Sequence, residues 1–247
     1  METKEIIRTR GGAFLLQETL PENIFTPEDF SEEQQMMRDA VKEFIDREVW
    51  PNKHRFEQKD YDFTFELMRK AGELGFLGVG VPEAYGGLEM GFVSTMLVCD
   101  YFSGATGSLS TAYGAHTGIG IMPIVLYGTE EQKKKYVPKL ASGEEIGCYC
   151  LTEPGAGSDA NSGKTKAVLS EDGTHYKISG QKIWISNAGY ASVMIVFARI
   201  EDDKNITGFI VPNDPENGIS MGEEEHKLGI HASSTRQVFF SETKVPV

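Results

Sequence analysis

The chain has 247 residues, of which 40% are hydrophobic and 25% are charged, and these fractions are those of an ordinary globular protein. The length suffices for one large hydrophobic core or two smaller ones. The formal net charge of −13 disfavours nonspecific binding to nucleic acids and to anionic membranes, so we expect no nucleic-acid partner.

The first residues predict a cytoplasmic protein, because Glu2 and Glu5 stand where a secretory signal would need an apolar core. Three cysteines are too few for a disulfide framework, and Cys148 and Cys150 would share one face of a strand as small buried residues. The five histidines lack metal-ligand spacing. We therefore predict no metal site and interpret each histidine as structural or exposed.

Residues 1–30 form a loosely patterned arm, and the first expected helix follows it. Ser31 and Gln34 make a capping-box pattern at its start. Apolar residues then recur on one helical face until Trp50 and Pro51 end the pattern.

More helices follow before the pattern changes. One is expected over residues 63–74, and a glycine-rich loop over residues 75–87 comes after it. Residues 90–127 are apolar, but polar residues interrupt every window long enough for a membrane span. We therefore expect two buried helices there, split near residues 104–107, and no transmembrane segment. A last capped helix is expected over residues 129–143.

The second half of the chain has short apolar runs, rich in β-branched and aromatic residues and bounded by turn signals. The two runs that flank residues 171–173 predict a hairpin. Strands are expected over residues 146–151, 164–169, 176–178, 193–198, 206–211 and 237–240.

This separation of helices from strands predicts an α+β multidomain protein. After the arm of residues 1–30, we expect an N-terminal all-α helical domain over residues 31–143. An antiparallel β-barrel or β-sandwich domain is expected over residues 144–247.

Residues 150–162 form the most informative stretch of the chain. Pro154 ends a strand, and Gly155 and Gly157 then allow a tight turn or the close approach of a ligand to the backbone. Oxygen-bearing side chains stand around them: Thr152, Ser158 and Asp159. The stretch is typical of an ordinary turn, and it also suits a cradle for a phosphate-bearing molecule.

Three segments carry a resemblance to a known family. Residues 150–159 read Cys-Leu-Thr-Glu-Pro-Gly-Ala-Gly-Ser-Asp and resemble the signature of the acyl-CoA dehydrogenases, flavoenzymes that desaturate acyl-CoA thioesters. Residues 180–187 resemble the second flavin-contacting strand of that family, and residues 227–236 resemble a later segment. These matches lie in family order, and the resemblance covers essentially the whole chain.

The resemblance implies FAD as the cofactor and assigns two segments to it. Many relatives have Thr where Ser186 stands, so we expect binding with looser positioning. As alternatives, the first segment is a sheet edge with a turn and Trp184 is a core aromatic residue. The residues implied in cofactor binding are Tyr149, Cys150, Leu151, Thr152, Gly157, Ser158, Trp184, Ile185 and Ser186.

The resemblance also implies a substrate site for the CoA portion of an acyl-CoA. Ser234 stands where the family has Asp, which removes a carboxylate, while Arg236 either pairs with a phosphate or is a solvated strand arginine. The residues implied are Ser158, Ser233, Ser234, Thr235 and Arg236.

No catalytic residue is expected in this chain. Glu153 belongs to the family signature, and we assign it a role in the loop. The family places the base that removes the α-proton, a Glu, in a C-terminal helical bundle. That bundle would begin near Val247 and is absent here, so we expect the 247-residue chain alone to be inactive.

The branch of the family that this chain resembles most is the very-long-chain one, on the basis of residues 114–120, 227–234 and 238–240. Small residues in a helix beside the acyl tunnel would leave room for a longer chain, and close helix packing is an equally good explanation. The substrate's chain length therefore stays open at this point.

The leading hypothesis is an FAD-dependent acyl-CoA dehydrogenase, an oxidoreductase on CH–CH groups in fatty-acid β-oxidation. It would pass electrons to an electron-transferring flavoprotein and form a homo-oligomer at full length. The alternatives are a noncatalytic flavin or acyl-CoA binding module and a related flavin oxidase or monooxygenase.

Overall fold

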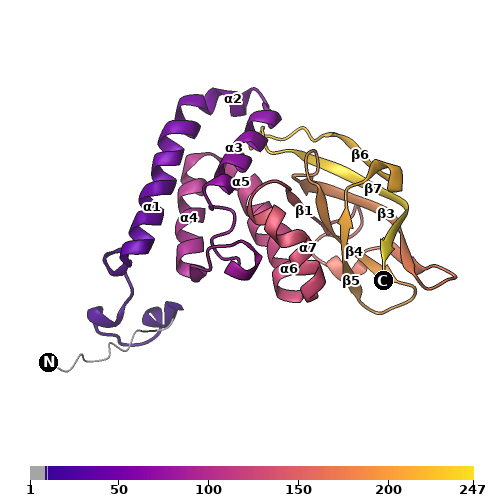
Figure 1. Ribbon diagram of the computed structural model, residues 1–247, viewed down its shortest axis with the longest axis horizontal. Helices are drawn as coiled ribbons and strands as arrows, with labels where there is room; N and C mark the ends of the chain where they lie inside the picture. Colours follow the sequence, from indigo (N-terminus) through magenta and orange to yellow (C-terminus); the bar gives the residue numbers. More distant parts are fainter. Residues whose placement is uncertain (1–8, 10) are drawn as a thin grey trace.

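The computed structural model describes residue 9 and residues 11–247, with helices first and strands second along the chain (Figure 1). Glu2 and Glu5, on which the prediction of a cytoplasmic protein depends, lie outside the described residues. No helix among the described residues is both long and apolar enough to cross a membrane.

The helical half begins with an arm of short 3-10 turns and continues in seven α-helices joined by short elements. The 3-10 turns are η1 (Gly11–Leu15), η2 (Pro21–Asn23), η3 (Pro27–Asp29), η5 (Trp50–Asn52) and η6 (Glu83–Tyr85), and the π-helices are η4 (Ile45–Val49) and η7 (Ala115–Ile121). The α-helices are α1 (Glu32–Phe44), α2 (Lys53–Glu57), α3 (Tyr61–Glu73), α4 (Gly91–Ala105), α5 (Gly107–Gly114), α6 (Met122–Tyr127) and α7 (Glu130–Ala141).

The predicted helix starts are confirmed where a capping box marks them. The hydroxyl of Ser31 accepts from the Gln34 amide at 3.2 Å, and Thr129 does the same for Gln132 at the same distance. The break predicted near residues 104–107 is also confirmed, because α4 ends at Ala105 and α5 begins at Gly107.

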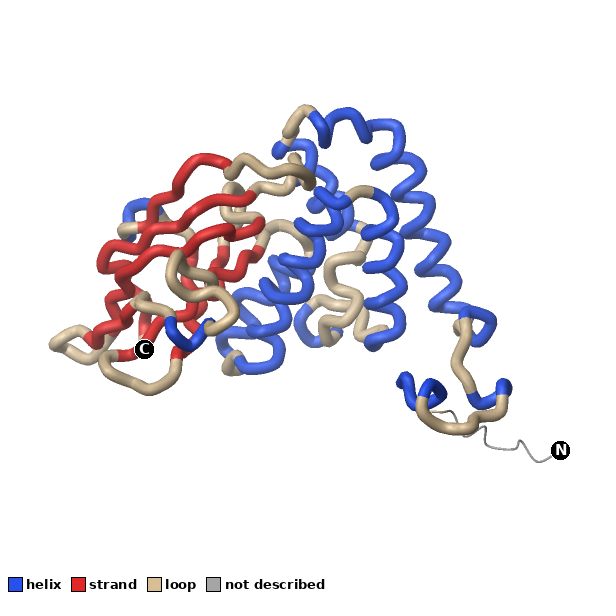
Figure 2. Tube along the Cα trace, turned by 180° about the vertical axis from the view of Figure 1, so that it is seen from behind, coloured by secondary structure: helices blue, strands red, loops and turns tan. Residues whose placement is uncertain are grey.

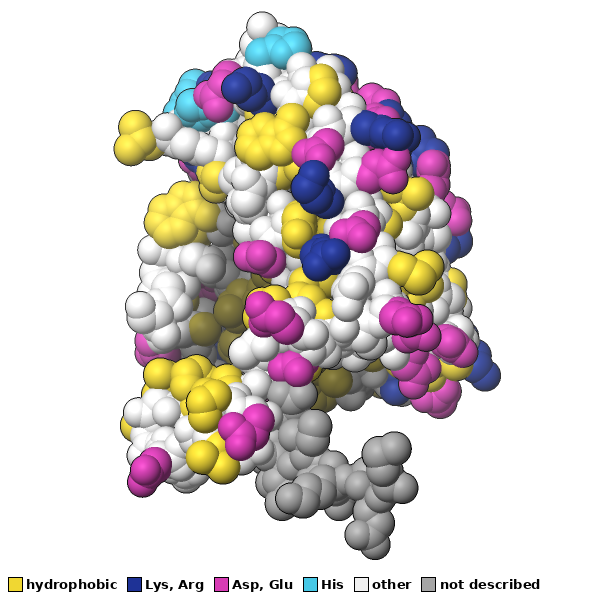
Figure 3. Space-filling view, turned by 90° about the vertical axis from the view of Figure 1, so that its left-hand side faces the viewer, with side chains coloured by type: hydrophobic (Ala, Val, Ile, Leu, Met, Phe, Trp, Pro, Cys, Tyr) yellow, Lys and Arg dark blue, Asp and Glu magenta, His cyan; other side chains and the backbone are white. Residues whose placement is uncertain are grey.

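The solvent face of α1 mixes acidic and basic side chains, while exposed apolar side chains gather on the arm below it (Figure 3). Lys42 pairs with Asp46 at 2.6 Å and Arg47 with Glu43 at 2.7 Å, both one helical turn apart. On the arm, Leu16 is 90% exposed.

The second half folds into one seven-stranded sheet that curls into half a barrel (Figure 2). Its order is β1-β4-β2-β3-β7-β6, with β5 paired to the other edge of β4. The strands are β1 (Gly147–Cys150), β2 (Lys166–Leu169), β3 (His175–Ser186), β4 (Val193–Ile200), β5 (Ile206–Pro212), β6 (Ile219–Glu224) and β7 (Thr235–Pro246), with two 3-10 turns, η8 (Ala160–Ser162) and η9 (Pro215–Asn217).

The prediction of a purely antiparallel barrel or sandwich is wrong, because the sheet is mixed. β1 runs parallel to β4 from Gly147↔Val193 to Cys150↔Val196, and β2 runs parallel to the end of β4. Between β1 and β4 the chain forms the antiparallel hairpin of β2 and β3. It then crosses back and enters β4 in the same direction as β1. Hairpin signals in a sequence report only neighbouring strands, and this crossover carries no such signal.

Three buried clusters hold the structure together. One fills the helical half and includes Phe44, Phe76 and Phe102, and a second fills the hollow of the curled sheet. Cys148 and Cys150 belong to the second, with sulfur atoms 3.9 Å apart, which confirms that they share a buried face. The third cluster packs α6 and α7 on the outer face of β4.

Candidate functional site

The loop after β1 contains an exposed turn. The backbones of Glu153 and Ala156 exchange two hydrogen bonds of 3.1 Å, which confirms the predicted turn. Gly155 and Gly157 are exposed, and a Cβ atom added to either would meet nothing within 4 Å. Ser158 is also exposed. The backbone of this turn is therefore open to a ligand on its outer side.

A buried ion pair holds the base of this turn. The Lys182 ammonium donates to Glu153 at 2.7 Å and to the Leu151 carbonyl at 3.1 Å, and the Glu153 carboxylate also accepts from the amides of Lys164 and Thr165. Burial lowers the pKa of Lys182 against the opposing effect of Glu153. Burial raises the pKa of Glu153, but its hydrogen bonds outweigh this and lower it. The Glu153 carboxylate thus holds the base of the loop through these contacts.

The far end of the same loop is tied to the turn between β4 and β5. Arg199 donates to the backbone carbonyls of Asn161, Asp203 and Lys204. The Asn161 side chain accepts from the Ile206 amide at 3.0 Å. Both ends of the loop are fixed, so its exposed turn is presented from a rigid base.

Trp184 projects from a bulge at the end of β3. The pairing of β3 with β7 shifts between Lys182 and Ile185, and Trp184 adopts a left-handed φ of 57° with its side chain 64% exposed. The Ile183 amide next to it donates to the Thr152 carbonyl at 2.9 Å. The structure therefore brings the loop after β1 and the end of β3 together, and Trp184 is not a core residue.

The start of β7 lies beside the same end of β3. Ile185 pairs with Arg236 and Ser186 with Thr235 in the register of the two strands. Two segments that the sequence analysis assigned to cofactor and substrate are therefore neighbours. Ile185 points its side chain into the core and is 2% exposed, while Ser186 is half-buried.

The segment at the start of β7 is closed by Glu224, a residue that the sequence analysis did not name. Its carboxylate accepts from the Ser234 hydroxyl at 2.7 Å, the Thr235 amide at 2.8 Å and Arg236 Nε at 2.7 Å. Ser233 and Ser234 are fully buried and Thr235 is 6% exposed. Glu224 therefore binds three neighbouring residues at the start of β7, and no local signal in the sequence at the end of β6 predicts these contacts.

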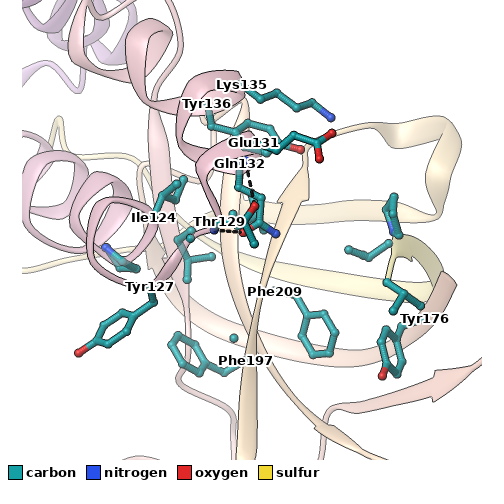
Figure 4. Close-up of a pocket in the computed structure, with 18 of the residues that line it drawn as sticks. Ile124, Tyr127, Thr129, Glu131, Gln132, Lys135, Tyr136, Tyr176, Phe197 and Phe209 are labelled. Atoms are coloured by element: carbon teal, nitrogen blue, oxygen red, sulfur yellow. Dashed lines mark hydrogen bonds between the residues drawn. The ribbon is translucent and has the colours of Figure 1, made fainter. Parts of the chain in front are cut away.

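A cavity opens elsewhere, between α6–α7 and the outer face of β4 and β5 (Figure 4). It encloses about 870 Å³, and Tyr127, Tyr136 and Phe197 are among the aromatic residues along it. Of the predicted site residues it contains only Tyr149, whose ring lies 4.9 Å from that of Phe197. Tyr149 thus points to the opposite face of β1 from Cys150, which is buried in the half-barrel.

Comparison with known families assigns both halves. Residues 31–144 match the N-terminal domain of acyl-CoA dehydrogenase, and residues 148–243 match the middle domain of the same family. Between them, the two matches span almost all of the chain after the arm.

Individual relatives agree with these matches. A Bacillus subtilis protein named "Probable acyl-CoA dehydrogenase" is 47% identical over 96% of this chain. A short-chain specific acyl-CoA dehydrogenase of Clostridium acetobutylicum is 38% identical over 89%. A crystal structure of an acyl-CoA dehydrogenase from Bacillus anthracis complexed with FAD is 47% identical over 96% of this chain, with a TM-score of 0.89.

The chain spans only part of each relative. It covers 39% of the Bacillus subtilis protein, 58% of the Clostridium acetobutylicum enzyme and 41% of the Bacillus anthracis chain.

Proposed function

The chain consists of the N-terminal and middle domains of the acyl-CoA dehydrogenase family, and on this premise we propose that it belongs to an FAD-dependent acyl-CoA dehydrogenase. The whole protein would introduce an α,β double bond into acyl-CoA thioesters in fatty-acid β-oxidation. One observation carries the proposal most: the open turn after β1 and the exposed Trp184 lie at one end of the sheet, joined through Thr152 and Ile183.

The residues at this end of the sheet fit FAD. A phosphate can approach the backbone at Gly155 and Gly157, where no side chain intervenes, and Ser158 is exposed beside them. The exposed indole of Trp184 offers a flat apolar surface to a flavin ring, and Ser186 offers a hydroxyl. We propose that the cofactor is held by Tyr149, Cys150, Leu151, Thr152, Gly157, Ser158, Trp184, Ile185 and Ser186. When bound, FAD would accept the hydride that leaves the substrate.

Buried residues would act here through their neighbours. Cys150 and Ile185 have side chains in the core, and the Tyr149 ring points into the cavity beside Phe197. These three residues would therefore meet a ligand only through their backbones. Lys182 and Glu153 form a buried ion pair that holds the base of the loop. The chain itself would therefore bind and orient, and the base that removes the α-proton would lie beyond Val247.

For the CoA portion of the substrate we propose contacts from Ser158 and from residues 233–236. Ser158 is exposed, and the terminal nitrogens of Arg236 make no hydrogen bond within the described part of the chain. The burial of Ser233, Ser234 and Thr235 makes these three the weaker part of the proposal.

For the substrate we propose only its class, an acyl-CoA thioester, and no length of its acyl chain. The very-long-chain branch gains no support from the relatives, since the Clostridium acetobutylicum relative is named for short chains. The glycines at the end of α5 and in η7 divide into two kinds. Gly114 and Gly118 face open space, whereas a Cβ on Gly120 would lie 3.1 Å from the Gly147 backbone. Close packing therefore explains Gly120, and room for an acyl chain remains a reason for Gly114 and Gly118.

We further propose an electron-transferring flavoprotein as electron acceptor, a homo-oligomer for the full-length protein and a cytoplasmic location. The division into an arm of residues 1–30, a helical domain of residues 31–143 and a flavin-binding domain of residues 144–247 belongs to the same proposal.

Anaerobic titration of the full-length protein with a series of acyl-CoA thioesters tests the function. We expect an acyl-CoA to bleach the visible absorption of bound FAD, and the preferred length to follow from the series. The chain of residues 1–247 alone should bind FAD weakly and show no bleaching. Oxygen consumption after reduction would indicate an oxidase, and binding without bleaching at full length would indicate a binding module.

A further inference from the structure

His116 is a completely buried histidine with a hydrogen bond at each ring nitrogen. It lies in η7, where Nε2 is 2.9 Å from the Leu140 carbonyl at the end of α7. On the other side, Nδ1 accepts from the amide of Gly147, the first residue of β1, also at 2.9 Å. One side chain therefore joins two elements of the helical half to the first strand of the sheet.

The two hydrogen-bond partners fix the tautomer of the His116 ring. A carbonyl oxygen only accepts and an amide N–H only donates, so Nε2 carries the proton and Nδ1 is bare. Burial lowers the pKa of His116 to about 4, which keeps this neutral form at pH 7.

Gly147 is held from the opposite side as well. The Asn187 side chain, just beyond β3, donates to the Gly147 carbonyl at 3.4 Å and to the Ala112 carbonyl of α5 at 2.9 Å. The backbone of Gly120 in η7 also packs on Gly147, where a Cβ on either residue would meet the other at 3.0–3.1 Å. We call His116, Gly147 and Asn187 the Gly147 junction.

The Gly147 junction lies between the two surfaces of the proposed site, which are the exposed face of η7 and the open turn after β1. The face of η7 that carries the exposed Gly118 and Ile119 is on its helical side. On its sheet side, β1 runs four residues from Gly147 to Cys150 and leads directly to Thr152 and the open turn. β1 is paired with β4 along its whole length, so Gly147 and the turn are the two ends of one short, hydrogen-bonded strand and loop.

We propose that His116 is a positioning residue that, through the Gly147 amide, sets the distance between η7 and the loop after β1. The proposal rests on the proposed function, in which a substrate lies along η7 and a cofactor lies on the loop. It differs from a general stabilising role, because it assigns the effect to one of the two hydrogen bonds of the ring. The bond to Leu140 stays within the helical half and carries no such effect.

Two variants separate the two bonds. His116→Asn places an amide oxygen near the position of Nδ1 and keeps an acceptor for Gly147, while it loses the bond to Leu140. His116→Gln places its amide near Nε2 and keeps a donor for Leu140, while it loses the bond to Gly147. Each variant loses one hydrogen bond, so both should lower the melting temperature to a similar extent.

The measurements are made on the full-length protein with bound FAD. We expect kcat/KM for the preferred acyl-CoA to fall on the order of tenfold to a hundredfold in His116→Gln and less than about threefold in His116→Asn. Amide hydrogen exchange in residues 146–152 should accelerate in His116→Gln alone. Val41→Ala, a cavity variant in α1 remote from the site, controls for general destabilisation and should leave kcat/KM unchanged.

Equal losses of kcat/KM in the two histidine variants, or unchanged exchange in residues 146–152 of His116→Gln, would overturn the proposal. A wild-type protein that fails to bleach its FAD would refute the proposed function instead. The exchange comparison needs no turnover, so it decides whether His116 holds β1 through Gly147 in either case.

Discussion

The open turn after β1 and the start of β7 both resemble segments of the same family, yet they are opposite in structure. At the first, Gly155, Gly157 and Ser158 are exposed on a loop whose base is fixed by Lys182. At the second, Ser233 and Ser234 are buried and the Ser234 hydroxyl is already bound to Glu224. A segment match identifies which residues lie near a site, and only burial and partners tell which of them can meet a ligand.

The largest effect should come from removing the ion pair below the open turn. Lys182→Met leaves the Glu153 carboxylate buried without its cation, which should lower the free energy of unfolding by about 3–5 kcal/mol and abolish FAD binding. Denaturant unfolding and flavin fluorescence measure these losses. Lys177→Met removes an exposed pair with Glu242 and is the matched control, with almost no effect on either. Equal behaviour of the two variants would show that the turn does not depend on its base.

The buried His116 should make the protein less stable in weak acid. Its folded pKa of about 4 lies below the ordinary histidine value of 6.5, so the unfolded chain binds the proton first as the pH falls. Stability should therefore decrease between pH 6.5 and pH 4, by roughly 3 kcal/mol from this group. Thermal unfolding over this range measures the slope, which should be shallower in His116→Asn. An unchanged slope in that variant would assign the acid sensitivity to other groups.

The closely packed Gly120 and the exposed Gly118 of η7 should respond differently to one added methyl group. Gly120→Ala forces a Cβ against the Gly147 backbone and should destabilise the protein by about 1–3 kcal/mol. Gly118→Ala meets no neighbour and should be neutral or stabilise the helix by up to about 1 kcal/mol. Chemical unfolding of the pair decides this, and a costly Gly118→Ala would contradict the open face that we assign to it.

The two candidate substrate segments can be compared directly with serine variants. Ser234→Ala removes the hydrogen bonds to Glu224 and Gly189, so it should lower stability by about 1–3 kcal/mol with little change in the KM for acyl-CoA. Ser158→Ala should leave stability unchanged and raise KM a few-fold, roughly the effect of one lost hydrogen bond. Steady-state kinetics with unfolding curves test both. A raised KM in Ser234→Ala would show that the buried segment opens to the substrate.

Local signals in the sequence determined much of the secondary structure of this protein. Ser31 and Thr129 announce their helices, because a capping box depends only on residues three apart. Alternation in a strand placed Cys148 and Cys150 on one buried face. The order of helices and strands, and the turn at residues 153–156, follow from the same short-range physics.

Only the tertiary structure decided the contacts between distant segments. The parallel pairing of β1 with β4, the carboxylate of Glu224 beside Ser234, and the bond from His116 to Gly147 each join residues that share no sequence pattern. Whether Trp184 is exposed or buried likewise depended on a bulge set by its partner strand. Such contacts form because buried polar groups must find partners wherever the folded chain brings one within reach.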